Sequence, residues 1–243
     1  EGDVVRDEGR VVVGAPAYLA LRVRETGGVR ERPWRGVGVE GSLLSGQSPQ
    51  LGFRHTGGPV RILLSARRRD PYLTVDQLLV MRAQSGVAHF SAEFQFQVNY
   101  SGVRTLRVDV PTDLADEIRI TREEIRKRGL EDAPDVKEGM TAWLLEGPGE
   151  FLGGVSIPLV WEIPLSDMDV GTRRELAIPH LIPRGVDRSQ GQIVLRKAES
   201  MDVVVAEAGN ALTPIDPRHD LRNGRSIPDA ALAYEFQRDW SLT

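Results

Sequence analysis

The sequence contains no cysteine, only three lysines and no long apolar segment. The lack of cysteine excludes disulfide bonds, thiolate metal sites and cysteine nucleophiles. Every apolar run is far shorter than the ~20 residues that a membrane-spanning helix requires, and no signal peptide is visible. The net charge of −4 provides no general attraction to nucleic acid or anionic lipid.

The composition is otherwise that of an ordinary folded protein. Hydrophobic residues make up 40% and charged residues 27% of the 243 positions, which is typical of globular chains. The first residue is Glu1, not methionine, and Thr243 falls in a strand-like phrase. We therefore expect this chain to be a piece of a longer protein, with any export signal or anchor outside it.

The beginning of the chain recurs near its end. Asp3–Gly28 aligns without a gap with Gly185–Asn210, at an offset of 182 (185 − 3). A second match, at an offset of 181, pairs Leu51–His55 with Leu232–Phe236. Two matches at nearly one offset predict a duplication, and the long period indicates repetition of whole domains. The identical pairs are Val4/Val186, Arg6/Arg188, Gly9/Gly191, Val12/Val194, Val23/Val205, Glu25/Glu207 and Gly27/Gly209.

Residues 88–100 alternate between apolar and polar side chains. This period of two predicts a half-buried antiparallel strand. Ser101-Gly102 predicts a turn into a further strand, Val103–Val110. The polar side of the first strand comprises His89, Ser91, Glu93, Gln95, Gln97 and Asn99.

Short β-rich segments separated by glycine and proline recur along the rest of the chain. They predict an all-β fold with a β-sandwich core, smaller β units and at most one or two short helices. Thr121 and Glu124 have capping-box spacing and Gly129 suits a helix end, so one short helix is expected there. The other predicted strands are 11–13, 19–24, 60–65, 72–82, 117–120, 141–145, 155–163, 192–196, 202–206 and 231–236, with a break at Gly147–Gly149.

Three segments follow from the repeat and the strand pattern. Residues 70–165 are predicted to form the β-sandwich domain. Residues 166–243 are predicted to form a small β unit, and residues 1–69 are its counterpart, the tail of a preceding unit.

Most common catalytic signatures are missing. The sequence has no G-x-S-x-G, Walker A, S-x-x-K or zinc-type histidine pattern, so we expect no catalytic residue and no cofactor. The G-x-G-x-x-G at Gly36, Gly38 and Gly41 has no helical pattern after it and predicts a loop. Asp167 and Asp169 are weak candidate ligands for calcium, because the full loop spacing and a distal glutamate are absent.

The four tryptophans fall into two groups. Trp143 and Trp161 lie inside strand segments and are expected in the core. Trp34 and Trp240 have loop-like neighbours. Because exposed aromatic rings stack on sugars or on partner side chains, these two are the candidates for a ligand or domain contact.

Several phrases together show a resemblance to known proteins. They resemble the β-rich modules of very large, uncharacterised, membrane-anchored proteins of planctomycete-type bacteria. The resemblance implies an extracytoplasmic location and a structural or interaction role, and it supplies no ligand. Neighbouring domains of the same polypeptide are the expected partners. The phrases are Phe96–Pro111, Ala142–Leu165, Ile178–Leu195 and Ala231–Phe236.

Three functions stay open on the sequence. The leading hypothesis is a non-catalytic structural or interaction module of a repetitive extracytoplasmic protein. Such a module would be attached to a membrane only through an anchor outside this chain. The alternatives are a carbohydrate-binding module, with cell-wall glycan as partner, and a hydrolase whose carboxylates carry no recognisable motif. Nucleic acid is not an expected partner.

Overall fold

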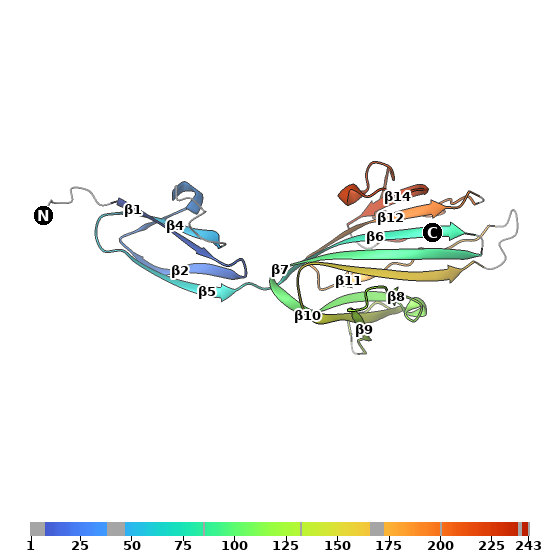
Figure 1. Cartoon of the computed structure of the whole chain (residues 1–243), viewed down its shortest axis with the longest axis horizontal. Coiled ribbons are helices and arrows are strands. Elements are labelled where there is room, and N and C mark those ends of the chain that lie inside the picture. Colours follow the sequence, from blue (N-terminus) through green and yellow to red (C-terminus); the bar gives the residue numbers. More distant parts are fainter. Residues whose placement is uncertain are drawn as a thin grey trace. The chain divides into compact units, whose positions relative to one another are not determined.

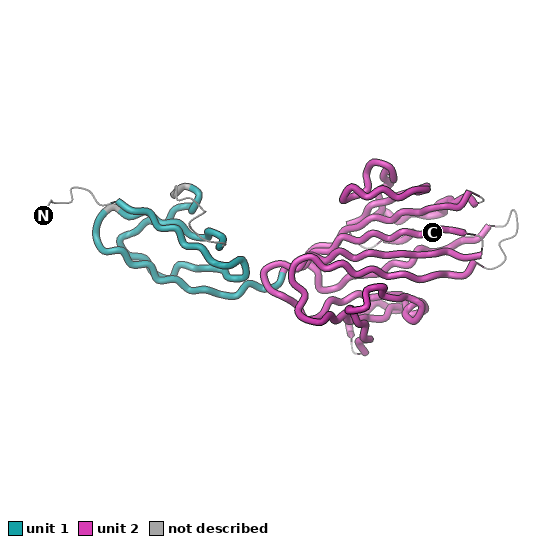
Figure 2. Tube along the Cα trace, in the orientation of Figure 1, with its two compact units in different colours: residues 1–71 teal, residues 72–243 magenta. Residues whose placement is uncertain are grey.

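The computed structural model describes residues 8–37, 47–84, 86–131, 133–165, 173–199, 201–237 and 240–242. The fold is all-β, as predicted: strands are joined by loops and a few 3-10 turns (Figure 1). The chain divides into two compact units, residues 1–71 (unit 1) and 72–243 (unit 2) (Figure 2). The division lies close to the predicted boundary between residues 69 and 70.

Unit 1 consists of two small sheets. Strand β4 is the middle strand of a three-stranded sheet with order β1-β4-β3, while β2 pairs with β5 in the other sheet. The side chain of Gln50 on β4 bonds the Leu21 amide and the Leu19 carbonyl of β2, so it ties the two sheets together. The strands are β1 (Glu8–Ala15), β2 (Leu19–Gly27), β3 (Arg30–Arg32), β4 (Ser48–Thr56) and β5 (Arg61–Arg68).

Unit 2 is organised around one sheet with strand order β13-β14-β12-β6-β7-β10-β8, in which β11 also pairs β7 and β9 also pairs β10. The predicted boundary between residues 165 and 166 is therefore wrong. Strands on both sides of it belong to the same sheet, because β12 hydrogen-bonds β6 along its whole length. The strands are β6 (Tyr72–Gln84), β7 (Val87–Pro111), β8 (Arg119–Ile120), β9 (Arg126–Gly129), β10 (Met140–Pro164), β11 (Ile182–Arg184), β12 (Arg188–Lys197), β13 (Leu212–Ile215) and β14 (Ala230–Phe236).

Strands β7 and β10 form a long bent hairpin of 25 residues on each side. Their first section, 87–98 with 153–164, lies in the large sheet, and their second section, 105–111 with 140–146, forms the other layer. The turn predicted at Ser101-Gly102 is wrong, because β7 runs through these residues. The break predicted at Gly147–Gly149 does not end β10, but the pairing of β10 with β7 is interrupted there. Both strands continue through the bend, but their pairing is irregular there: the register shifts between Glu146 and Phe151 and again between Phe151 and Gly153.

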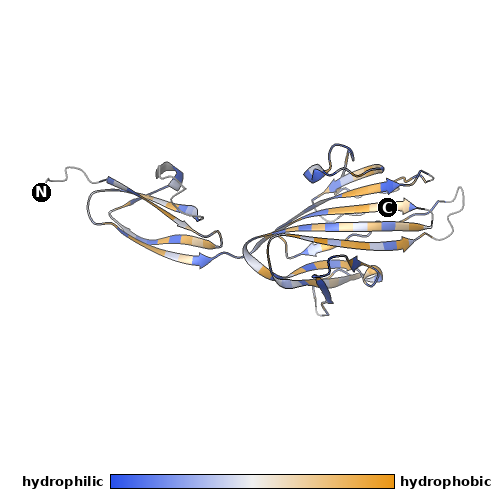
Figure 3. Ribbon diagram, in the orientation of Figure 1, coloured by the Kyte–Doolittle hydropathy of each residue, from blue (hydrophilic) through white to orange (hydrophobic). Residues whose placement is uncertain are grey.

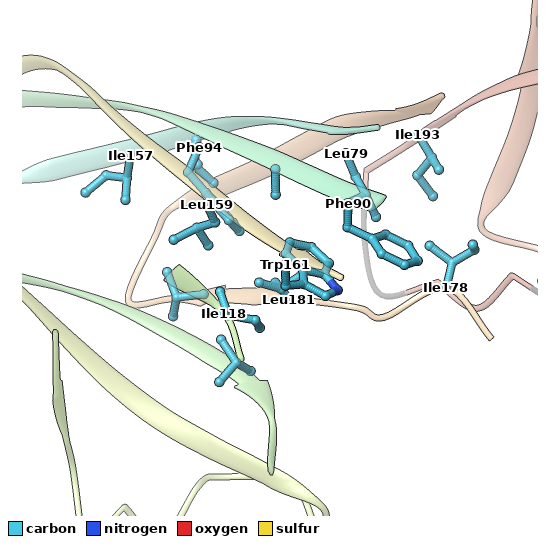
Figure 4. Close-up of a cluster of buried hydrophobic side chains, with 14 of the residues drawn as sticks. Leu79, Phe90, Phe94, Ile118, Ile157, Leu159, Trp161, Ile178, Leu181 and Ile193 are labelled. Atoms are coloured by element: carbon cyan, nitrogen blue, oxygen red, sulfur yellow. The ribbon is translucent and has the colours of Figure 1, made fainter. Parts of the chain in front are cut away.

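The main core lies between these two layers. From Ala88 to Val98 the apolar residues of the alternating segment are buried, as predicted, whereas Tyr100 on the same side of the pattern is 39% exposed. The alternation of hydropathy along the strands can be followed in Figure 3. Phe90, Phe94 and Trp161 pack there with Ile118 and Leu181 (Figure 4). Trp143 and Trp161 are both buried, as the sequence predicts.

The helix expected over Thr121–Gly129 does not form. Residues 126–129 are instead strand β9, which pairs with residues 143–146 of β10. The Lys127 ammonium lies 4.0 Å from the centre of the Trp143 ring and donates to the carbonyls of Ala115 and Ile118. These long-range contacts outweigh a local capping signal that is worth about 1 kcal/mol. Residues 202–206, predicted as a strand, are also not one.

Strand β12 runs parallel to β6, which requires a crossover connection. Part of this connection, β11, pairs with the second section of β7. Asp109 of β7 is fully buried and accepts hydrogen bonds from Arg107 and from Arg184 of β11, at 2.9 and 2.8 Å. The buried carboxylate thus holds β11 against β7, and β11 is part of the connection that places β12 beside β6.

Candidate functional site

One face of the large sheet of unit 2 carries polar side chains in rows across four strands. Gln190, Asp76, Gln95 and Ser156 stand opposite one another on β12, β6, β7 and β10. Because side chains alternate between faces, the apolar neighbours of these residues point into the core. The next row, closer to the bend, is Arg188, Thr74, Gln97 and Gly154.

The two rows form the floor of a hollow with a volume of about 500 Å³. Tyr72 and Asn223 also line it. The Tyr72 ring is 42% exposed and lies 6.5 Å from the ring of Tyr100, so an aromatic surface faces solvent beside the amide-rich floor. This combination of planar amides and an exposed ring suits a polar, hydroxyl-rich ligand.

The loop between β13 and β14 is fastened to this face by ion pairs. Arg225 donates to Glu93 at 2.7 Å, and Arg222 lies 3.6 Å from Asp76 and 3.2 Å from Glu235. The Gln192 side chain of β12 bonds the Asp220 carbonyl and the Arg222 amide of the same loop. The loop between β13 and β14, whose Asn223 lines the hollow, is therefore held in place on the sheet.

The two acidic side chains under this loop have opposite pKa shifts. Burial raises the pKa of Asp76, against the opposing charges of Arg222 and Arg225. Partial burial alone would also raise the pKa of Glu93, but hydrogen bonds from Gln95 and Ser156 and the charge of Arg225 together lower it. Each carboxylate has an arginine of the loop as its partner, so the arrangement serves to anchor the loop.

Glu93→Gln is expected to lower the free energy of unfolding by up to about 1 kcal/mol at neutral pH. The pKa of Glu93 is lowered in the folded chain, so its ionised form contributes stability above its ordinary pKa of 4.5. That contribution is lost as the pH falls through the folded value, and the two proteins should then become equally stable. Urea unfolding at a series of pH values measures this. Glu123→Gln, at an exposed position, is the control, and a difference that grows in acid would contradict the expectation.

The two tryptophans predicted as contact residues, Trp34 and Trp240, differ in their exposure. Trp240 is only 7% exposed, with its ring centre 4.6 Å from that of His180 and 5.5 Å from that of Phe236. The expectation of a ligand contact at Trp240 is thus contradicted, because a core ring has no free face. Trp34 lies part-exposed in the 3-10 turn η1 (Trp34–Val37) of unit 1, with the Arg35 guanidinium 5.3 Å from its ring centre.

Asp167 and Asp169 lie outside the described residues. Within the part of the chain that the structure describes, no three histidine, aspartate or glutamate side chains gather as a metal site would require. No helix among these same residues has the length and apolar character needed to cross a bilayer.

Sequence reasoning missed the hollow itself. Its signal was partly visible, since Gln95 and Gln97 belong to the polar side of the alternating strand. The contributions of Asp76 and Gln190 depend on the parallel pairing of β6 with β12, between segments that lie far apart in the chain.

Comparison with known proteins identifies no relative by sequence, since no family model and no curated protein matches this chain. Among solved structures, the fold is similar to part of leukotriene A4 hydrolase from Saccharomyces cerevisiae, with a TM-score of 0.33 and 9% identity over 70% of this chain and 27% of that one. A mutant M1 zinc metallopeptidase from Deinococcus radiodurans is similar with a TM-score of 0.29 and 13% identity, over 72% of this chain and 42% of that one. The chain spans less than half the length of these proteins, and the likeness is too slight to carry an argument about activity.

Proposed function

We propose that this chain is a non-catalytic structural module built from a repeated β unit of an extracytoplasmic protein. The observation that carries the proposal is a shared strand register. Strand β1 pairs with β4 through Val11↔Phe53 and Val13↔Leu51. Strand β12 pairs with β14 through Ile193↔Tyr234 and Leu195↔Leu232, which are the equivalent positions in the two sequence matches.

The irregularities of the two pairs also correspond. The register of β1 and β4 shifts between Val13 and Gly14, and that of β12 and β14 shifts between Leu195 and Arg196, which are again the aligned positions of the sequence repeat. The third strand follows the same plan, since β3 lies beside β4 as β13 lies beside β14. An equal order of three strands, with equal register and bulge position in the first pair, is expected of duplicated units and rarely arises from unrelated sequences.

A glycine faces an aromatic ring at the same place in both pairs. Gly9 stands opposite His55, and a Cβ there would overlap the imidazole ring. Gly191 stands opposite Phe236, and a Cβ there would lie 2.6 Å from Cζ of the ring. The identity of these glycines in the sequence repeat therefore has a packing reason in each unit.

The pairing of β2 with β5 in unit 1 has a short counterpart in unit 2, which also supports duplication of the unit. In unit 1, β2 and β5 meet through Thr26↔Ile62 and Gly27↔Arg61. In unit 2, Ala208 bridges Leu242, and the Gly209 amide donates to the Ser241 carbonyl at 3.0 Å. Ala208 and Gly209 align with Thr26 and Gly27 in the sequence repeat.

The proposed extracytoplasmic location rests on the resemblance to large membrane-anchored proteins of planctomycete-type bacteria. The proposed partners are neighbouring domains of the same polypeptide and cell-wall glycan or protein, and any membrane attachment lies outside this chain.

The complete gene and the location of its product test this proposal. The coding sequence should contain further copies of the unit at the spacing of the internal repeat, together with an export signal. Antibodies raised against the whole chain should detect the native protein in the envelope fraction of the source cells. A gene with no further copy, or a product confined to the cytoplasm, would sink the proposal.

Carbohydrate binding is the second candidate function, and the hollow on the large sheet is the observation that favours it. The amides of Gln95, Gln97 and Gln190 supply donors and acceptors for hydroxyl groups, while Tyr72 supplies a ring for stacking. This site replaces the buried Trp240 as the candidate sugar contact.

Tyr72→Ala is expected to weaken glycan binding at least tenfold, which corresponds to about 1.4 kcal/mol. Binding to an array of cell-wall glycans, followed by titration with the best ligand, measures this. Tyr18→Ala is the matched control, because Tyr18 is an exposed tyrosine, 47% accessible, in unit 1. Equal affinity of the Tyr72 variant and the unaltered chain would count against a sugar site in the hollow.

A further inference from the structure

Strand β1 is an edge strand of unit 1. It pairs with β4 on one side, and no other strand in the described part of the chain pairs with it. An edge strand presents backbone N–H and C=O groups that can pair with an added strand. Its central residues, Val11, Val12 and Val13, are apolar, whereas protected edges are usually charged or interrupted.

The counterpart of β1 has a neighbour on both sides. Strand β12 pairs with β14 on one side and, in parallel, with β6 on the other, from Arg188↔Thr74 to Lys197↔Ala83. Strand β1 therefore matches β12 in its antiparallel pairing but lacks the parallel neighbour.

Burial shows the consequence of the difference. Ile193, Val194 and Leu195 of β12 are at most 2% exposed. Their counterparts Val11, Val12 and Val13 are only partly buried. Parallel strands are normally covered on both faces, so the valines of β1 have the residue types of a covered strand without its cover.

The core of unit 1 is correspondingly small. Among its described residues, only Ala15 and Phe53 are fully buried apolar side chains, while Tyr18, Val60 and Leu63 are more than 40% exposed. A unit of this size usually needs a larger core or a partner for stability. Unit 1 therefore resembles the edge strands of a larger sheet, separated from the other strands of that sheet.

We infer that the edge of β1 at Val11–Val13 binds a parallel β6-type strand of another repeat unit. Unit 1 then supplies the last three strands of that unit's sheet, as β12, β14 and β13 do in unit 2. The pairing of β12 with β6 gives the register: Val11 and Val13 stand opposite the equivalents of Leu79 and Met81. This inference rests on the proposed repeat and names its partner.

An extended chain tests the inference. A second copy of residues 72–184 is placed ahead of the chain, with its Arg184 joined directly to Asp3, because Asp3 is the counterpart of Gly185. The added segment contains β6 to β11 and lacks its own β12 to β14. Hydrogen exchange of the β1 amides that do not pair with β4 should become at least tenfold slower than in the original chain, because they now pair with the added strand.

The control is a chain extended with residues 72–243, joined to Glu1. Its added sheet already contains its own β12, so exchange at β1 should be the same as in the original chain. The inference is overturned if the first extended chain leaves β1 exchange unchanged, whether the added segment folds or not. It is also overturned if the original chain alone forms a dimer with protected β1 amides, since the edge then pairs with a second copy of itself.

The two proposals fail separately. A gene without further copies would remove the repeat proposal whatever the exchange result. Further copies in the gene together with unprotected β1 amides in the extended chain would remove only the strand-pairing inference.

Discussion

Replacing Asp109 with asparagine is expected to lower the free energy of unfolding of unit 2 by about 3–5 kcal/mol, the usual cost of removing one member of a buried ion pair. The carboxylate is 0% exposed and accepts two hydrogen bonds from Arg107, at 2.9 and 3.2 Å, and one from Arg184, at 2.8 Å. Without the charge, two largely buried guanidinium groups lose their common partner. Urea unfolding followed by tryptophan fluorescence measures the change, because Trp143, Trp161 and Trp240 all lie in unit 2.

Asp135→Asn is the control for this experiment. Asp135 also accepts a hydrogen bond from Arg107, at 2.8 Å, but its side chain is 61% exposed. Solvent screens such a pair, so the variant should be much less destabilised than Asp109→Asn. If Asp109→Asn were no more harmful than Asp135→Asn, the buried carboxylate would not be what holds β11 to β7.

Trp161→Ala is expected to cost about 3–5 kcal/mol, the range for deleting a large aromatic side chain from a core. The indole is 2% exposed and stacks on the Phe90 ring, with centres 5.0 Å apart and planes 3° from parallel. The two residues stand directly opposite each other on β10 and β7, at the end of the hairpin farthest from its bend (Figure 4). Thermal and urea unfolding of the variant measure the loss.

Leu152→Ala provides the comparison within the same strand. Leu152 lies in the bulged part of β10 and is 61% exposed, so its loss should change the stability by no more than about 0.5 kcal/mol. A similar effect of both substitutions would mean that the two layers are not held together by the packing around Trp161.

The predictions for Asp109 and Trp161 both concern how the two layers of unit 2 are held together. The packing around Trp161 joins the layers that the bent hairpin creates, and the Asp109 cluster holds the connection that crosses from one layer back to the sheet. Asp109 is bonded to Arg184 of β11, in the connection that leads to β12, and Trp161 belongs to the core cluster that also contains Ile193 of β12. The parallel pair of β12 and β6 supplies half of the floor of the hollow, and it is the pattern from which the partner of β1 is inferred.

Much of this protein was determined by sequence alone. The alternation over residues 88–100 identified a strand, its buried side and the polar side that became part of the hollow. The short β-rich segments and the glycine and proline pattern predicted the all-β class. These features are local, because side-chain period and backbone preference act within a few residues.

The tertiary structure alone decided which strands meet. Residues 126–129 became strand β9, although Thr121 and Glu124 have a capping signal, because pairing with β10 stabilises them more. Ser101-Gly102 and Gly147–Gly149 lie inside the long strands β7 and β10 where the pairing is irregular, because the long-range pairing on either side of them outweighs the local turn signal. Trp240 entered the core through contacts with His180 and Phe236, and β12 joined β6 across the predicted domain boundary. Such outcomes depend on contacts between residues far apart in the chain, whose energies no local pattern records.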